Sequence, residues 1–416
     1  MTENFTLLFL AAFTLTLATR LWLKLRQIRH VGAHRAAVPA EFAARITLAS
    51  HQKAADYTVD RCQTAISAIL VDAVLLLAFT LGGGLAALHG LWSAHLDGIA
   101  YGLAMIFSVL LISALADLPL SLYSQFVVEA RHGFNRMTPA LFVSDLGKQT
   151  LLGIAIGTPV IAAVLWLMGA MGEYWWLWVW LFWSGFNLLM LFIYPTWIAP
   201  LFNKFEPLPE GDAKTRIEAL LARCGFRSNG LFVMDGSKRS AHGNAYFTGF
   251  GDNKRIVFFD TLLARLSPGE IEAVLAHELG HFRKKHIVQR IVLMFAGSLA
   301  FLWLLGQLID APWFYAGLGV PARDTALALI LFFLVVPVFV FPLTPLSSHW
   351  SRRHEFEADA YAAAHADAGE LARALVKLYD DNAATLTPDP LHSLFHDSHP
   401  PAAQRIAQLQ RQEQPA

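Results

Sequence analysis

The stretch S-P-G-E-I-E-A-V-L-A-H-E-L-G-H, residues 267–281, predicts the helix around which the rest of the chain is arranged. Ser267 is a favourable N-cap and Pro268 suits the first helical position. Glu270, at the third position, can bond back to the Ser267 amide and complete a capping box. A helix therefore begins here, and the side chains that follow have helical spacing.

Two histidines lie one helical turn apart in this stretch. Side chains four residues apart project from one face, so His277 and His281 can direct their imidazoles at a single metal ion. Glu278 can reach water on that metal without binding the metal itself. This is the H-E-x-x-H pattern of zinc metalloproteases, in which zinc lowers the pKa of its water toward about 7 and the glutamate takes the proton. The alternative is a chance match of two solvated or core histidines, since the chain has 16 histidines.

A third metal ligand is expected downstream, in S-R-R-H-E-F-E-A-D-A-Y-A at residues 351–362. Two histidines and one carboxylate leave the fourth zinc position open for water. Glu355 can complete that set, and Asp359, four residues on, can accept a hydrogen bond from a ligand histidine and fix its orientation. Glu357 is predicted to point elsewhere. Taken alone, this stretch would more often be a solvated charged helix.

The composition indicates an integral membrane protein with a substantial polar part. Of 416 residues, 55% are hydrophobic and 15% charged, with a mean hydropathy of +0.44; soluble domains usually carry roughly 25% charged residues. Lys+Arg and Asp+Glu number 32 each, so no nucleic-acid partner is predicted. Cys62 and Cys224 are the only cysteines, which excludes a disulfide framework and a cysteine-based zinc site. The metal must be held by histidine and carboxylate.

Seven apolar runs are long enough to cross a bilayer. The first lacks the small-residue cleavage site of a signal peptide, so it is predicted to be a retained span. Asp72 and Asp117 lie within or at the ends of spans, where an ionisable group is costly, and neither is assigned a role. The runs are at about residues 5–23, 65–88, 99–123, 150–171, 175–194, 287–308 and 325–343.

The charges of the loops predict the orientation of these spans. A basic cluster follows the first run, and the positive-inside rule places it in the cytoplasm. The N-terminus then lies outside, while the basic stretch of residues 204–285 is cytoplasmic; only Arg323 falls in a predicted outer loop. The active site is therefore expected to face the cytoplasm. The membrane is expected to be a bacterial inner membrane or the endoplasmic reticulum. The cluster consists of Lys24, Arg26, Arg29 and Arg35.

The polar region before the capped helix contains an extended, aromatic-rich segment, G-N-A-Y-F-T-G-F at residues 243–250. In zinc peptidases an exposed strand edge beside the metal commonly holds substrate by backbone hydrogen bonds, and Asn244 could add side-chain contacts. An ordinary edge strand or hairpin is the alternative. The other elements predicted in the polar parts are a helix at 213–224, strands at 231–234 and 255–259, and a short amphipathic helix near 404–412.

Several further motifs occur in one order along the chain. D-G-S-K-R-S-A-H-G-N-A-Y-F-T-G-F and V-E-A-R-H-G-F-N-R-M-T come before H-E-L-G-H, and E-F-E-A-D and H-D-S-H-P-P come after it. Together they resemble the type I CAAX prenyl protease family of integral membrane zinc metalloendopeptidases. The resemblance implies a mainly α fold: a multi-pass helical bundle of about seven spans that encloses a chamber, with an inserted zincin (gluzincin-like) metalloprotease domain.

The same resemblance implies roles for single residues. It assigns His277, His281 and Glu355 to one zinc ion per chain, and Glu278 to the catalytic base. The metal helix is predicted to continue towards the sixth span.

Two residues outside the ligand set are placed near the scissile bond by the resemblance: Asn244 of N-A-Y-F and His399 of S-H-P-P. An imidazole near a peptidase metal could also hydrogen-bond the developing oxyanion. Gln404, just before Arg405, stands where the family usually has an acidic residue after H-P-P, which puts a local ion pair there in question.

The predicted function is a membrane-embedded zinc metalloendopeptidase. It would use Glu-activated, zinc-bound water on lipidated (CAAX prenyl type) or membrane-associated peptides, in contact with membrane lipid. An HtpX-like quality-control protease is an alternative, but that type has fewer spans. A non-catalytic channel or lipid-binding protein is an alternative from another class, although a passive chamber needs no helix bearing two ligands and a base. The oligomeric state is not predicted.

The chain is predicted to have four parts. They are an N-terminal bundle of spans 1–5 with cytoplasmic loops at 1–200, a zincin-like region with the H-E-L-G-H helix at 201–286, spans 6 and 7 at 287–346, and a cytoplasmic C-terminal region with the third ligand and the H-P-P segment at 347–416.

Overall fold

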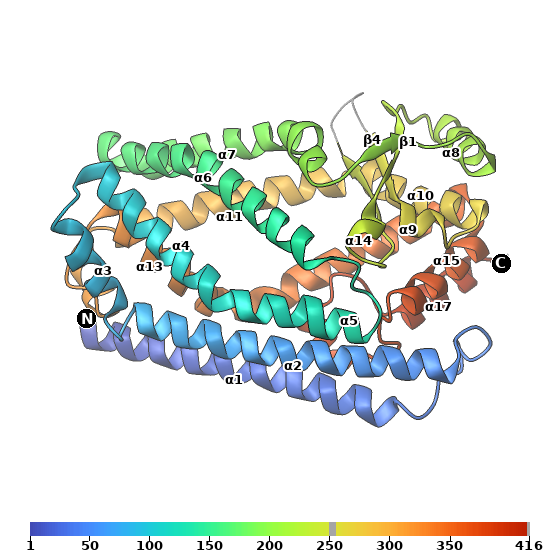
Figure 1. Cartoon of the computed structure of the whole chain (residues 1–416), viewed down its shortest axis with the longest axis horizontal. Helices are drawn as coiled ribbons and strands as arrows, with labels where there is room; N and C mark the ends of the chain where they lie inside the picture. Colours follow the sequence, from blue (N-terminus) through green and yellow to red (C-terminus); the bar gives the residue numbers. More distant parts are fainter. Residues whose placement is uncertain (249–254, 414–416) are drawn as a thin grey trace.

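The computed structural model of the chain describes residues 1–248 and 255–413, and it is mainly helical (Figure 1). Within these ranges seven helical segments are long and apolar enough to cross a membrane. The predicted count of seven spans is confirmed. The segments are Thr2–His34, Leu48–Phe79, Gly98–Arg131, Pro139–Ala170, Gly172–Leu201, His286–Leu308 and Thr325–His365.

The second span was predicted wrongly at both ends. Helix α2, Leu48–Phe79, begins well before residue 65, because Thr47 caps it by accepting a hydrogen bond from the Ser50 amide at 3.1 Å. It also ends before residue 88. A run of three glycines follows, and Gly83 adopts the left-handed region at φ 78°, which ends the helix. The apolar residues beyond it form a separate helix, α3.

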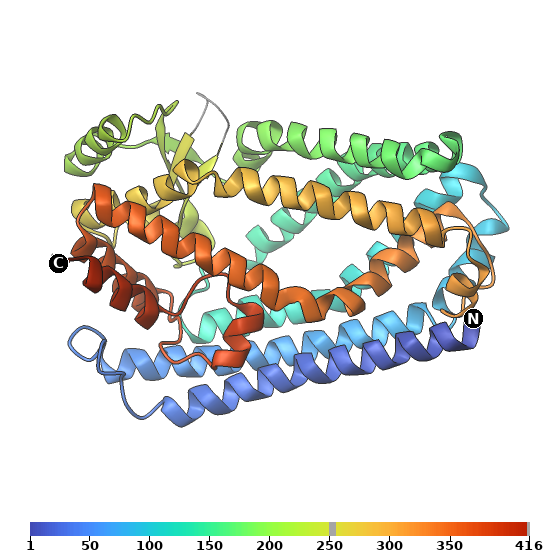
Figure 2. The same ribbon diagram turned by 180° about the vertical axis from the view of Figure 1, so that it is seen from behind.

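The spanning helices form an elongated bundle (Figures 1 and 2). Helices α1 and α2 lie side by side along one wall, α7 and α11 form the opposite wall, and α4, α6 and α13 run obliquely between them. The N-terminus lies at the end of the bundle remote from the C-terminus. The bounds are α1 Thr2–His34, α3 Gly84–Ser93, α4 Gly98–Tyr123, α5 Glu129–Arg131, α6 Pro139–Ala170, α7 Trp175–Ile193, α11 His286–Leu308, α12 Pro312–Ala316 and α13 Thr325–Val340.

The bundle encloses a chamber rather than a continuous core. Its close packing lies among α1, α2, α4 and α13, where Phe9, Met105 and Leu331 are fully buried. The same four helices also line a cavity of about 560 Å³, and a second cavity of about 900 Å³ lies near α7, α11 and α12. The predicted fold, a multi-pass helical bundle around a chamber, is confirmed.

The polar part adds a small mixed sheet that leans on helices at the C-terminal end of the molecule (Figure 1). Among the described residues the sheet has four strands in the order β1-β2-β4-β3; β2 and β4 are parallel, and the other two pairs are antiparallel. The predicted strands at 231–234 and 255–259 are confirmed as β2 and β4. The bounds are β1 Phe205–Pro207, β2 Leu231–Met234, β3 Ala245–Thr248 and β4 Arg255–Phe259.

The predicted extended segment at 243–250 is β3 with its lead-in; residues 249 and 250 lie outside the described residues. The predicted helices at 213–224 and 404–412 correspond to α8 and α17. The helices of the polar part are α8 Asp212–Arg223, α9 Asp260–Leu263, α10 Pro268–Arg283, α14 Thr344–His365, α15 Ala368–Asp381, α16 Pro390–His396 and α17 Ala402–Glu413.

Regions distant in sequence share one core in the polar part. Leu220 of α8, Phe258 of β4 and Leu275 of α10 pack in the same buried cluster as Leu371 of α15 and Leu409 of α17. The described residues of segments 201–286 and 347–413 therefore pack as one unit, with two spans inserted between them. The division of the chain into four parts stays a prediction.

The metal helix does not continue into the sixth span, contrary to the prediction. Helix α10 ends at Arg283, Lys285 adopts the left-handed region at φ 58°, and α11 begins at His286. This conformation is uncommon for a residue with a side chain, and it breaks the run of helical hydrogen bonds. The turn brings His286 back against the metal helix.

Candidate metal centre

The capping box predicted at the start of α10 is confirmed. Ser267 Oγ accepts a hydrogen bond from the Glu270 amide at 3.3 Å, and Glu270 Oε2 accepts one from the Ser267 amide at 2.7 Å. Lys377 of α15 donates to the same Glu270 oxygen at 2.7 Å. The first turn of α10 is thus held by hydrogen bonds within its own capping box and by one hydrogen bond from α15.

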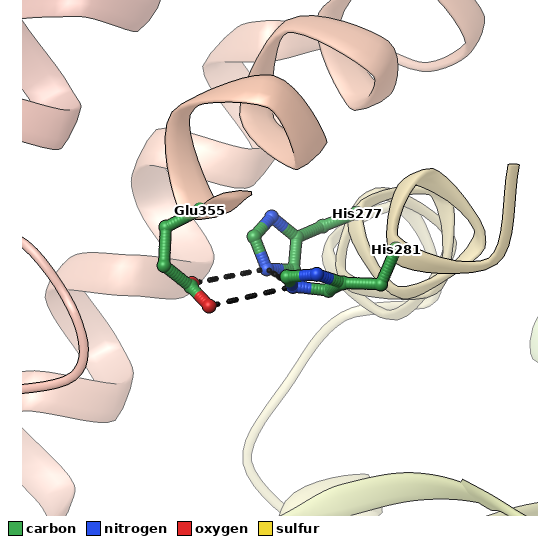
Figure 3. A group of neighbouring side chains, drawn as sticks. All are labelled: His277, His281 and Glu355. Atoms are coloured by element: carbon green, nitrogen blue, oxygen red, sulfur yellow. Dashed lines mark hydrogen bonds and ion pairs between the residues drawn. The ribbon is translucent and has the colours of Figure 1, made fainter. Parts of the chain in front are cut away.

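The structure brings His277, His281 and Glu355 together at the contact between α10 and α14 (Figure 3). The two Nε2 atoms are 3.3 Å apart, and each lies 3.4 Å from one oxygen of the Glu355 carboxylate. The three side chains are between 3% and 15% exposed. Both imidazoles and the carboxylate therefore point at one small, buried volume.

Gly280 of the H-E-L-G-H motif allows this approach. A Cβ atom at this position would lie 2.9 Å from the Cα and 3.0 Å from the carbonyl oxygen of Ala358. Real Cβ atoms essentially never come that close to backbone atoms, so a larger residue would push α14 away from α10. The glycine sets the distance between the two helices, and thereby that between Glu355 and the histidines.

The donor set fits a metal ion. Ligands about 2.0–2.1 Å from a tetrahedral zinc ion lie roughly 3.3 Å from one another, and the observed separations are 3.3–3.4 Å. In the part of the chain that the structure describes, the buried Oε2 of Glu355 has no hydrogen-bond partner, and the groups that face it are His277 Nε2 at 3.4 Å and the Arg405 guanidinium at 3.6 Å. Across the same residues no other group of three His, Cys, Asp or Glu side chains has such spacing.

A buried ion pair holds the first histidine. Asp359 Oδ1 lies 2.8 Å from Nδ1 of His277 and accepts its N–H when Nε2 faces the metal position. Arg405 of α17 donates to both oxygens of Asp359, at 2.6 and 2.8 Å. Arg405, which follows H-P-P, therefore pairs with a carboxylate 46 residues away on α14 and not with a residue beside it. Burial alone would lower the pKa of His277, but the carboxylates of Asp359 and Glu355 outweigh it and raise the pKa to about 9.

The second histidine is held by residues that the sequence did not indicate. His281 Nδ1 lies 2.9 Å from Nδ1 of His286, whose Nε2 lies 3.1 Å from Oε2 of Glu357. The His354 ring stacks on His286 at 3.8 Å. Glu357 points away from the metal position, as predicted, but it faces His286. His286 reaches His281 because the chain reverses after α10. No glycine or proline at residues 282–286 marks that reversal, so the sequence carried no signal for this contact.

The remaining predicted site residues line one cleft of about 210 Å³ beside the ligands: Asn244, Glu278 and His399. Burial holds the pKa of the Glu278 carboxyl above its usual range. His399 Nε2 lies 3.5 Å from Glu355 Oε1, and its side chain is 60% exposed. The structure places these residues together, and their roles in catalysis stay predictions.

Asn244 lies at the start of β3, which is an edge strand of the described sheet and pairs there with β4 alone. The sequence did not indicate what positions this edge. Asn382, just after α15, accepts a hydrogen bond through Oδ1 from the Gly243 amide at 3.2 Å, and the same oxygen lies 3.1 Å from His242 Nδ1. The contact joins residues about 140 positions apart, so no local pattern could have predicted it.

Seven spans, a buried His-His-Glu donor set and an adjacent carboxylate in a cleft define a membrane-embedded metalloendopeptidase. Two family descriptions match the chain: "CAAX prenyl protease N-terminal, five membrane helices" over residues 27–204, and "Peptidase family M48" over residues 207–413. The chain belongs to the CAAX prenyl protease family of these metallopeptidases. It is an integral, multi-pass membrane protein that acts on peptide or protein substrates.

Relatives from distant organisms support this membership. A CAAX prenyl protease 1 homolog from Caenorhabditis elegans is 33% identical, with 96% of this chain and 97% of that protein covered. One from Arabidopsis thaliana is 41% identical over 74% and 73% of the two chains. The crystal structure of Ste24p from S. mikatae superimposes with a TM-score of 0.90 at 31% identity, covering 97% of this chain and 98% of that one.

Proposed function

We propose that the metal is a single zinc ion held by His277, His281 and Glu355, and that the enzyme cleaves prenylated or other membrane-associated peptides. The observation that carries the proposal is the spacing of 3.3–3.4 Å among the three donor groups, which suits tetrahedral zinc with its fourth position free. In such a set zinc supplies Lewis acidity toward a carbonyl and a water of lowered pKa.

Glu278 is proposed as the general base. It follows His277 on α10 and lines the cleft without joining the donor set. A carboxyl whose pKa is raised by burial holds a proton more readily than an exposed one, so it can accept a proton from water and return it to the leaving amine. His399, on the same cleft, would donate a hydrogen bond to the carbonyl oxygen as negative charge develops on it.

Asn244 and the edge of β3 are proposed to hold the substrate in extended form. An edge strand offers unpaired backbone groups to a peptide, which then adds to the sheet. Asn244 is exposed at the head of this edge and lines the cleft together with Glu278. A peptide paired with β3 would therefore pass beside the metal position.

A prenylated substrate is proposed because the relatives are named CAAX prenyl proteases and because Glu355, which lines the cleft, lies on the helical segment Thr325–His365 that includes the seventh span. The basic residues that follow the first span favour a cytoplasmic active site. The membrane would be a bacterial inner membrane or an endoplasmic reticulum, and substrates would arrive within membrane lipid. HtpX-like quality control is the second candidate to be tested.

The test combines metal analysis with cleavage assays on the purified full-length protein. We expect about one zinc per chain, and cleavage of a farnesylated peptide in preference to its unprenylated form and to a misfolded membrane protein. Glu278→Gln should retain zinc and lose activity by roughly 100- to 10,000-fold. Glu218→Gln, a change of the same kind on the exposed face of α8, is the matched control.

Three results would contradict the proposal in different ways. Wild-type cleavage rates in Glu278→Gln would exclude the mechanism. A preference for misfolded membrane proteins would favour the HtpX-like alternative. Absence of zinc together with measurable solute flux would favour a channel.

A further inference from the structure

The lead-in to strand β3, residues 239–243, is fastened to the membrane bundle. It lies against residues 134–136, which connect α5 to α6, and the two segments pair through their backbones. They come from the two motifs that precede H-E-L-G-H in the sequence, of which the proposed chemistry uses only Asn244. The contacts are an antiparallel bridge between Asn135 and Ser240, and hydrogen bonds from the Arg136 amide to the Arg239 carbonyl and from the Ala241 amide to the Phe134 carbonyl, both at 3.1 Å. The backbone that enters β3 is therefore fixed to the bundle.

A buried ion pair strengthens this attachment. Arg239 donates to both carboxylate oxygens of Asp145 on α6, at 2.8 and 3.0 Å, and to Asn203 Oδ1 at 2.7 Å. The Asp145 side chain is 7% exposed and that of Arg239 is 19% exposed. A bidentate pair between an arginine and a carboxylate fixes orientation as well as distance. The lead-in to β3 is therefore held in one place relative to the fourth span.

His242 lies near the end of this segment, two residues before Asn244. Its ring stacks on Phe134, with the centroids 4.3 Å apart and the planes at 20°. The Gly243 amide can only donate, so Asn382 faces it with Oδ1, at 3.2 Å. His242 Nδ1 lies 3.1 Å from the same oxygen and therefore donates to it. One amide oxygen thus holds both the imidazole and the backbone that enters β3.

The other ring nitrogen of His242 faces the membrane helices. Nε2 lies 3.4 Å from Oε2 of Glu129, and Glu129 Oε1 accepts a hydrogen bond from the Tyr57 hydroxyl of α2 at 2.5 Å. Glu129 belongs to the helical segment of the third span, Gly98–Arg131, and its side chain is 18% exposed. His242 therefore connects the edge of β3 to the second and third spans on one side and to Asn382 on the other.

We propose that His242 is a positioning residue, which sets where the β3 edge lies relative to the metal position and thereby which peptide bond of the substrate is cleaved. The inference rests on the proposed function, in which an extended peptide pairs with β3 beside Asn244. Strand residues are spaced about 3.3 Å apart, so an edge displaced by that distance presents the neighbouring peptide bond to the metal position. A slip of one residue also turns the other face of the peptide to the site. His242 controls the cleavage position through the strand, without touching the substrate itself.

The test compares two substitutions at the contact between Asn382 and His242. Asn382→Leu has nearly the same size but removes the acceptor of both hydrogen bonds, whereas Asn382→Asp retains an oxygen for both. A hydrogen bond of this kind contributes a factor of roughly 2 to 10, so in Asn382→Leu the KM for a peptide ending in Cys(farnesyl)-Val-Ile-Met should rise about 3- to 10-fold, with kcat within about twofold. Mass spectrometry should show an additional product, cleaved at a neighbouring bond. Asn382→Asp should restore the parental KM and the single product.

The same additional product is expected from His242→Ala, because this change removes the link between the β3 edge and the bundle. His95→Ala, at an exposed histidine just after α3, is the matched control and should leave KM and the product unchanged. A merely damaged enzyme loses activity at the normal bond without cutting another, so the product pattern separates positioning from folding. A single product in both His242→Ala and Asn382→Leu, whatever the KM, overturns the assignment.

Failure of the proposed function gives a different result. If the parent protein does not cleave the farnesylated peptide, hydrogen–deuterium exchange of residues 243–248 in the full-length protein measures the contact without hydrolysis. Exchange of this segment that becomes faster relative to that of β2 in His242→Ala supports the role of His242 at the β3 edge. The parental ratio of the two exchange rates in that variant overturns it.

Discussion

The two histidines of the donor set are one helical turn apart, yet different kinds of contact hold them. His277 bonds directly to Asp359, which is fully buried and is clamped by two hydrogen bonds from Arg405. His281 is held through a second imidazole, His286, whose other nitrogen faces a carboxylate that is 35% exposed. We call Asp359 and Arg405 the first arm, and His286 and Glu357 the second arm. The first arm is buried, whereas the second ends at a partly exposed carboxylate.

From this difference we expect that, if the donor set binds a metal, binding is coupled to folding more strongly through Asp359 and Arg405 than through His286 and Glu357. Arg405 lies on the last helix, α17, so the charge that orients His277 comes from a segment 128 residues away. The second arm is local, because His286 follows His281 by five residues across the turn at Lys285. Disrupting the first arm should therefore affect stability as well as metal affinity, and disrupting the second should affect metal affinity alone.

The largest effect is expected from Arg405→Met, which removes both arginine hydrogen bonds from the buried carboxylate of Asp359 and leaves it only the contact with His277 among the described residues. Breaking one side of a buried ion pair costs about 3–5 kcal/mol. We expect a large fall in the thermal unfolding temperature of the detergent-solubilised protein, together with loss of bound metal. Thermal unfolding and metal analysis of the same preparation measure both.

The matched control lies on the other arm. Arg353, whose side chain is 73% exposed, contacts Glu357 at 3.1 Å. An exposed pair of this kind is worth about 0–1 kcal/mol, so Arg353→Met should barely change the unfolding temperature. Equal shifts for the two arginine variants would show that burial does not distinguish the arms.

The second effect in size is expected from Asp359→Asn, which preserves shape but removes the negative charge that accepts the N–H of His277. Loss of such an orienting partner typically reduces metal affinity by about 10- to 100-fold. Competition against a chromophoric chelator measures this change. An affinity within twofold of the parent would mean that Asp359 does not orient the ligand.

The two arms also differ in how many of their residues could be predicted from the sequence. The capped helix, both histidines, and the pair Glu355 and Asp359 were predictable, because spacings of four residues on a helix define a shared face. Arg405 and Asn382 were not, since Arg405 lies 46 residues from Asp359 and Asn382 lies 139 residues from Gly243, and both contacts depend on tertiary packing.

The same limit applies to the fold. Hydropathy identified the seven spans, because crossing a bilayer requires a minimum number of apolar residues. It misplaced α2, Leu48–Phe79, since the first half of that helix is polar and a glycine run, not a change in hydropathy, ends it. It also missed the break between α10 and α11, because Lys285 adopts a left-handed conformation without a glycine to signal it.

A smaller effect is expected from Glu357→Gln on the second arm. The amide oxygen can still accept a hydrogen bond from His286, and solvent already screens this partly exposed position, so only part of the orienting charge is lost. We expect metal affinity to fall by at most about tenfold, less than in Asp359→Asn, with no change in unfolding temperature. A loss greater than that of Asp359→Asn would reverse the ranking of the two arms.

The smallest effect is expected in the coupling between the arms. In the described residues the two chains of contacts, from Asp359 and from Glu357, meet at the ligand set and share no other side chain. Changes without shared partners usually add within about 0.3–0.5 kcal/mol. The metal affinity of the Asp359→Asn, Glu357→Gln double variant should therefore equal the product of the two single effects within about twofold. A coupling above about 1 kcal/mol would show instead that the arms adjust the two imidazoles as one unit. In that case Asp359 and Arg405 would still stabilise the fold, but the metal affinity would depend on both arms together.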